Sequence, residues 1–312
     1  MSQATLPETS PRQVSLRREQ PLDREVVANR LLVASAEHSF DPLIEIDWDA
    51  PLAPDTFFMP AHRVSLYGTP LWEQMSREQR VDLSRHEVAC LASVGIWFEV
   101  ILMGLLARHV YDEDLTSAHT QYAFTELADE CRHSTMFGKL VTKLDTPAYG
   151  VGRKLHNLAR VMFHAPMGAS SWTAILVAEE ILDTFQREAM NDESVQPVVQ
   201  AVNRIHVVEE ARHVRYAREE LQRVVARTSP VRMHFERTRT AMIAYQVASH
   251  LIHPKVYAAV GLDPVEARRQ ANASEARAET LRWSAQRLVG FLREVGLIAG
   301  PTEHLWRKAH LV

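Results

Sequence analysis

Residues 94–103 read VGIWFEVILM, and this stretch decides how the chain folds. Glu99 is the one charged residue in it, and the apolar run extends on both sides from Leu91 to Ala107. These 17 residues are fewer than the roughly 20 that a helix needs to span a bilayer, so a buried core helix is expected. A carboxylate inside such a core must be compensated by a proton, an arginine or a metal ion.

Proline placement around this stretch predicts the other helices, because proline is excluded from helix interiors but accepted in a first turn. Eight of the 15 prolines precede residue 71, and long proline-free runs follow. Ser76 and Gln79 form a candidate capping box before the first long helix. The expected helices cover about 80–109, 118–144, 168–190 and 197–226, with a fifth from Ser229-Pro230 and a last one from Asp263-Pro264 to Val295. The sequence therefore predicts an all-α bundle of four long helices with additional outer helices.

The proline-rich region before about residue 75 is expected to form an irregular N-terminal arm that wraps the bundle. Residues 1–25 are expected to be a mobile tail and residues 26–312 a single domain.

Charge and cysteine content narrow the class of partner. The 35 basic and 39 acidic residues give a formal charge of −4, which argues against a nucleic-acid-binding surface. Two cysteines cannot build a disulfide framework, and the first 20 residues lack a signal-peptide pattern, so a cytoplasmic protein is expected. No membrane association is expected, and the ligand should be a small molecule or a protein.

Two short motifs place a carboxylate and an imidazole three residues apart on one helix face: Glu130-Cys131-Arg132-His133 and Glu210-Ala211-Arg212-His213. Chance alone would supply about one Glu-x-x-His pair in a chain of this composition, so the two motifs are weak evidence by themselves. His206 lies one turn before Glu210 and therefore shares a helix face with that second motif.

Two further carboxylates fall in apolar helices. Glu99 is one, and the other is Glu179 or Glu180, which follow 13 uncharged residues and which periodicity does not separate. Four helices thus supply Glu, Glu-x-x-His, Glu and Glu-x-x-His, the ligand set of ferritin-like di-iron and di-manganese bundles. Oxygen-rich ligation favours iron or manganese over zinc or copper, and iron is preferred because ferrous pairs reduce dioxygen.

At these residues the chain resembles the di-iron N-oxygenases related to p-aminobenzoate N-oxygenase (AurF-type), a family with four glutamate and three histidine ligands. The likeness covers about residues 60–225, and the stretches 66–72, 85–87 and 305–308 also look similar. Carried over residue by residue, it implies the metal ligands Glu99, Glu130, His133, Glu179, His206, Glu210 and His213. It further implies two iron ions, dioxygen as co-substrate, an electron donor that is not identified, and oxidation of an arylamine to a hydroxylamine, nitroso or nitro product in specialised metabolism.

Other functions stay open on the sequence. A di-iron hydroxylase or desaturase acting on carbon would use the same ligands, and a radical-generating subunit would need a nearby tyrosine, for which Tyr122 is the candidate. A metal-storage or non-catalytic metal-binding protein is a third possibility, against which the extra histidine His206 argues. Asp183 is the expected hydrogen-bond partner of a ligand histidine, and Arg282 and Trp283 are candidate substrate contacts. A homodimer is the commonest default.

Overall fold

A computed structural model describes residues 23–164 and 167–312. Its elements, in chain order, are α1 (Arg24–Glu37), α2 (Pro42–Glu45), η1 (Ala61–Arg63), α3 (Pro70–Gln74), α4 (Arg77–Val110), α5 (Ala118–Lys143), α6 (Arg153–Phe163), α7 (Ala169–Ala189), α8 (Pro197–Ala226), α9 (Pro230–Ser249), α10 (Lys255–Ala259), α11 (Pro264–Ala273), α12 (Glu275–Glu294), η2 (Gly300–Thr302) and α13 (Glu303–Lys308). Within these residues the only β pairing is an isolated bridge between Phe57 and Val195. The predicted all-α class is confirmed.

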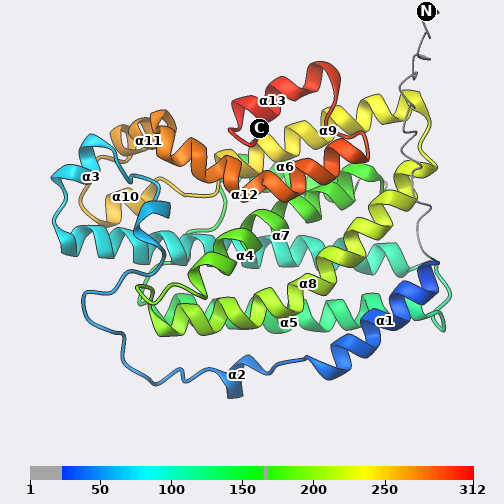
Figure 1. The fold of residues 1–312 in the computed structure, drawn as a ribbon, viewed down its shortest axis with the longest axis horizontal. Coiled ribbons are helices and arrows are strands. Elements are labelled where there is room, and N and C mark those ends of the chain that lie inside the picture. The colour runs from blue at the N-terminus through cyan, green and yellow to red at the C-terminus, as the bar shows by residue number, and fades with distance from the viewer. Residues whose placement is uncertain (1–22, 165–166) are drawn as a thin grey trace, which may run out of the picture.

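Four long helices form the bundle. α4 packs along α5 and α7 packs along α8, and contacts between α5 and α8 and between α4 and α7 close the set. Outer helices cover it: α9 and α12 pack on α7, and α13 packs on α9. Figure 1 shows these outer helices on one side of the bundle and α1 and α2 on the other.

Several helices begin at the capping residues and prolines from which the sequence predicts a helix start. Ser76 Oγ accepts a hydrogen bond from the Gln79 backbone N–H, and Gln79 Oε1 accepts one from the Ser76 N–H, which completes the predicted capping box. Ser229 and Asp263 cap α9 and α11 through their side chains, each just before a proline in the first turn. These expected helix starts are confirmed.

Helix α4 is apolar as well as long. By length and composition it could cross a membrane, but 56% of its most apolar window is buried inside the protein. Its Glu99 side chain lies in the centre of the bundle, 2% exposed. α4 is therefore a core helix, as the sequence predicts.

Three expectations need correction. The N-terminal arm is not wholly irregular: α1 is a 14-residue helix, capped by Asp23, that packs on α5 and α8. The expected last helix is two helices, because Ser274 ends α11 and caps the start of α12. Helix α6 was not expected. The predicted mobility of residues 1–25 falls largely on residues 1–22, which lie outside the described part of the chain.

Candidate metal centre

The seven side chains that the resemblance implies as ligands all lie in the middle of the four long helices, where none is more than 3% exposed. α4 supplies Glu99, α5 supplies Glu130 and His133, α7 supplies Glu179, and α8 supplies His206, Glu210 and His213. Their ligand atoms fall into three overlapping groups in which all atoms lie within 4.8 Å of one another. Residues up to 114 positions apart in sequence thus meet at one point in the core.

The two Glu-x-x-His motifs face each other across α5 and α8 and form the first group. His133 Nδ1 lies 3.0 Å from Glu130 Oε2, and His213 Nδ1 lies 3.0 Å from Glu210 Oε2 and 2.8 Å from Glu130 Oε1. Both rings therefore turn Nδ1 towards the shared carboxylates and Nε2 away from them. Each motif presents a carboxylate oxygen and an imidazole nitrogen from the same face of its helix.

An acid from the opposite helix contacts Nε2 of each of these two imidazole rings, and we call these two residues, Glu209 and Asp129, the crossed acids. Glu209, on α8, places Oε2 2.8 Å from Nε2 of His133, on α5. Asp129, on α5, places Oδ2 3.2 Å from Nε2 of His213, on α8. Such carboxylates fix the tautomer and orientation of a ligating histidine. The expectation that Asp183 does this is wrong, because Asp183 instead pairs with the Arg187 guanidinium at 2.7 Å.

The motif arginines neutralise those acids. Arg132 forms an ion pair with Asp129 and lies 3.9 Å from Glu209, while Arg212 lies 3.6 Å from Asp129. Burial alone would raise the pKa of Asp129, but the hydrogen bond and charge of His213, reinforced by Arg132, hold that pKa below its usual value. The acid therefore stays ionised and keeps accepting the histidine proton.

His206 belongs to the other two groups, one with Glu99 and His133 and one with Glu179 and Glu210. Its Nε2 lies 3.6 Å from Glu99 Oε1, and its Nδ1 lies 2.8 Å from Gln186 Oε1 on α7. An amide oxygen can accept a hydrogen bond but cannot donate one, so His206 Nδ1 carries the proton that Gln186 accepts, and the Nε2 lone pair faces Glu99. His206 is thus oriented as a ligand would be.

The structure separates Glu179 from Glu180. The Glu180 carboxylate accepts hydrogen bonds from Nε (2.8 Å) and from a terminal nitrogen of Arg218, on α8. The charge of Glu180 is therefore already paired. Glu179 lies in a group with His206 and Glu210 instead. Of the two neighbours, Glu179 is the one that faces the cluster.

The cluster has the electrostatics of a cation site. Burial and, after it, the neighbouring carboxylates raise the pKa of Glu99 and of Glu179 well above the usual range. Glu99 Oε2, Glu210 Oε1 and His206 Nε2 are buried and have no hydrogen-bond partner among the described residues. Buried polar atoms normally have a hydrogen-bond partner. These three unpartnered oxygen and nitrogen atoms each have a lone pair available, which suits the coordination of metal ions.

Besides the crossed acids Asp129 and Glu209, the sequence pattern gave no indication of a third acid beside the cluster. Glu126 lies one turn before Glu130 on α5, the position that His206 takes relative to Glu210 on α8. It is fully buried, and neither carboxylate oxygen has a hydrogen-bond partner within the described chain. Burial raises the pKa of Glu126 well above its usual value. Comparing the residues one turn before each Glu-x-x-His motif, Glu126 and His206, could have indicated Glu126 from the sequence.

Tyr122, the tyrosine singled out from the sequence, is fully buried one further turn before Glu126. Its ring packs against Tyr216, with centroids 4.9 Å apart. A second His/Glu group, formed by His109, His119 and Glu220, lies beyond these rings. The Arg24 guanidinium binds both oxygens of Glu220, so that group already contains its cation.

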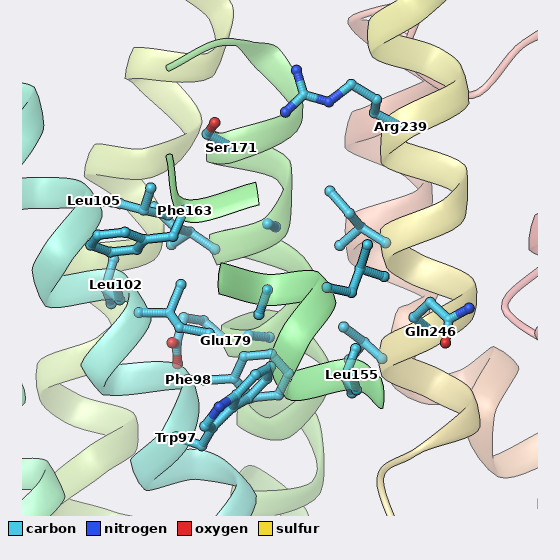
Figure 2. A pocket seen from close by; sticks show the side chains of 18 residues that line it. Trp97, Phe98, Leu102, Leu105, Leu155, Phe163, Ser171, Glu179, Arg239 and Gln246 are labelled. Carbon is cyan, nitrogen blue, oxygen red and sulfur yellow. The ribbon is translucent and has the colours of Figure 1, made fainter. Parts of the chain in front are cut away.

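Two cavities approach the cluster along the seam between α4 and α7. The α9-side cavity, of about 90 Å³, lies between α4, α6, α7 and α9 and reaches Glu179. Figure 2 shows Glu179 in its wall, with Trp97 and Phe98 towards one end and Ser171 and Arg239 towards the other. The α8-side cavity, of about 60 Å³, lies between α4, α5, α7 and α8 and reaches Glu99 and His206. Of the expected substrate contacts, Arg282 pairs with Glu275, and Trp283 packs edge-on against Phe185 in the wall of the α8-side cavity.

A four-helix bundle whose helices bring glutamates and Glu-x-x-His motifs to one buried point is a ferritin-like fold. Within that class, the chain matches the family model described as P-aminobenzoate N-oxygenase AurF over residues 21–296, and it belongs to this family. The family resemblance and fold expected from the sequence are confirmed.

The chain is also similar to curated mycobacterial proteins described as uncharacterized. The uncharacterized proteins Rv0885 of Mycobacterium tuberculosis and Mb0909 of Mycobacterium bovis are each 28% identical to this chain over 201 residues. The match covers 62% of this chain and spans 59% of the length of each relative.

Proposed function

We propose that this protein is a non-haem di-iron oxygenase that uses dioxygen to oxidise the nitrogen of a small-molecule amine. The single observation that carries this proposal is the convergence of seven buried carboxylate and imidazole side chains, in overlapping groups, at the centre of an AurF-family bundle. In this proposal Glu99, Glu130, His133, Glu179, His206, Glu210 and His213 hold two iron ions. Their four carboxylates balance the four positive charges of two ferrous ions.

The ions, when bound, would supply the electrons and open positions that activate dioxygen. The protein's own part is to present and orient the ligands. Asp129 and Glu209 accept the Nε2 protons of His213 and His133, which leaves Nδ1 of each ring free to donate its lone pair. Gln186 does the same for Nε2 of His206 by accepting from Nδ1. Each of the three imidazole rings is thus oriented by a contact at one nitrogen that turns the other nitrogen towards the cluster.

The apolar walls of the two cavities exclude bulk water from the cluster, which protects a reactive oxidant from quenching. We expect an amine, preferably an arylamine, as substrate, and a hydroxylamine, nitroso or nitro compound as product. An external electron donor must restore the ferrous state after each turnover. A cytoplasmic homodimer working in a biosynthetic route completes the proposal.

The test is turnover by the full chain, reconstituted anaerobically with ferrous iron and then given ¹⁸O₂, a chemical reductant and a panel of arylamines and alkylamines. Mass spectrometry should find ¹⁸O on nitrogen, and the Glu210→Ala variant should give none. Oxygen found only on carbon would favour a hydroxylase, and a ferrous protein that consumes no dioxygen with any amine would favour a non-catalytic metal-binding protein.

A further inference from the structure

The two cavities differ in what they offer to a ligand. The α8-side cavity touches two members of the cluster, Glu99 and His206, whereas the α9-side cavity touches only Glu179. Glu99 Oε2 and His206 Nε2 are also buried and without hydrogen-bond partners among the described residues, as is Glu210 Oε1, whose residue lines neither cavity. The two of these three residues that line a cavity both line the α8-side cavity.

The wall of the α8-side cavity carries no positive charge. Apart from Glu99 and His206, its polar residues are the neutral amides Gln186 and Asn203, and its other described residues are apolar, with Phe137 and Phe185 among them. Arg63 follows the Phe58–Pro60 segment of the wall by three residues in sequence, but its guanidinium is already engaged. Both Glu188 oxygens bind Arg63, and its guanidinium stacks 3.6 Å from the Trp283 ring centroid.

An acidic ligand would be penalised in this cavity. Burying a carboxylate without a cation or several hydrogen bonds costs several kcal/mol, and the wall of this cavity supplies no basic side chain. A neutral ligand avoids this cost. Its apolar body would gain from contact with Phe137 and Phe185, at roughly 25 cal/mol per Å² of apolar surface removed from water.

The two amides can recognise one neutral polar group. Gln186 Oε1 is used by His206, but its amide nitrogen donates no hydrogen bond to any described residue, and neither does that of Asn203. Each is thus available to a carbonyl, ether or hydroxyl oxygen of a ligand. The small volume, about 60 Å³ against the roughly 150 Å³ of a cavity that holds benzene, limits the body to a single ring or a short chain after modest side-chain movement.

We propose that the α8-side cavity binds the substrate. We further propose that this substrate is an uncharged, compact, apolar amine without an acidic group. Both statements rest on the proposed function. The competing site is the α9-side cavity, where Arg239 forms no ion pair with any described residue and lies near Ser171 (Figure 2). That cavity would suit an amine with an acidic end. The two sites therefore predict opposite charge preferences.

Two ligands of the same skeleton separate them: 4-methylaniline, which is neutral at pH 7.5, and 4-aminobenzoate, which is anionic. Binding to the metal-loaded full chain is measured by calorimetry. We expect 4-methylaniline to bind at least tenfold more tightly. Ala92→Leu, which fills the α8-side cavity, should weaken this binding at least tenfold with iron content unchanged, and Ala174→Leu, the matched change in the α9-side cavity, should alter it less than twofold.

Leu91→Phe fills the same α8-side cavity and replaces Ala92→Leu if that variant does not fold. Tighter binding of 4-aminobenzoate that is lost in Arg239→Gln or Ala174→Leu would overturn the inference, even if N-oxygenation occurs. Conversely, neutral amines that bind as expected but are never oxygenated at nitrogen would overturn the proposed function and leave the cavity assignment standing.

Discussion

Asp129 on α5 holds Nε2 of His213 on α8 at 3.2 Å, and Glu209 on α8 returns the contact to His133 on α5 at 2.8 Å. Each helix thus orients the histidine of the other. Glu209 is further fixed by the backbone N–H of Phe40, 2.9 Å from its other oxygen, so the N-terminal arm supports the same arrangement. The pairing makes the two motifs one structural unit.

Breaking either crossed contact should loosen the metal without unfolding the protein. Asp129→Asn and Glu209→Gln keep the side-chain shape but remove the charge that fixes the imidazole tautomer. Loss of such a partner lowers metal affinity about 10- to 100-fold. Competition for ferrous iron with a chromophoric chelator measures this. Asp183→Asn, which changes an acid paired only with arginines, is the control. Equal iron affinity in all three variants would contradict the role assigned to the crossed acids.

The neighbours Glu179 and Glu180 should separate into a ligand and a structural ion pair. Glu179→Gln should lower iron content while the melting temperature of the metal-free protein does not fall. Glu180→Gln should keep the iron but lose about 1–3 kcal/mol of stability, because Arg218 would lose its charged partner. Elemental analysis and urea unfolding of both variants check this. The opposite pattern would exchange the two assignments.

The cluster of buried glutamates and histidines could be predicted from the sequence because it depends on residue spacing within single helices. Spacing of three or four residues within one helix places Glu130 with His133 and His206 with Glu210, whatever the neighbouring helices do. The crossed acids could not be foreseen in this way, because Asp129 and Glu209 meet histidines 84 and 76 residues away. Without their partners, they read as ordinary charges on a helix surface.

Tertiary contacts also decided what periodicity left open. Adjacent residues on a fully buried helix both face protein, so only the position of Arg218 distinguishes Glu180 from Glu179. Helix α1 escaped prediction because it lies in a proline-rich region and gains its stability from packing on α5 and α8. Its Arg24 then pairs with Glu220, a contact 196 residues apart.

That Arg24–Glu220 contact has a defined pH dependence. Burial would raise the pKa of Glu220, but His109 and Arg24 lower that pKa to about 2. A lowered acid pKa gives stability that is complete above the unfolded value near 4.5 and is lost as the pH falls towards 2. Glu220→Gln should therefore cost about 2 kcal/mol at pH 7 and less at pH 3.5, as urea unfolding would reveal.

Glu113→Gln removes a more exposed acid that also contacts Arg24, and it should cost less than about 0.5 kcal/mol. A pH-independent effect of Glu220→Gln would argue that the residue acts through packing alone.

Glu126 should show the reverse dependence in the metal-free protein. Because burial raises the pKa of Glu126, the folded state holds a proton that the unfolded chain releases, and stability falls as the pH rises above about 4.5. Glu126→Gln removes this penalty. The variant should be more stable than the parent at pH 8 and equally stable at pH 4.5, as measured by urea midpoints. A variant that is less stable at pH 8 would show that the carboxylate is ionised and paired.

If the buried glutamates and histidines hold a pair of metal ions, the metal content of the reconstituted protein will show it. After anaerobic reconstitution with ferrous iron and removal of loose metal, elemental analysis should find about two iron ions per chain. The double variant Glu130→Ala/His213→Ala should retain fewer than about 0.3 while keeping its helical circular dichroism spectrum. Wild-type protein that binds no transition metal, or a double variant that binds as much iron as the parent, would show that these side chains do not form a metal centre.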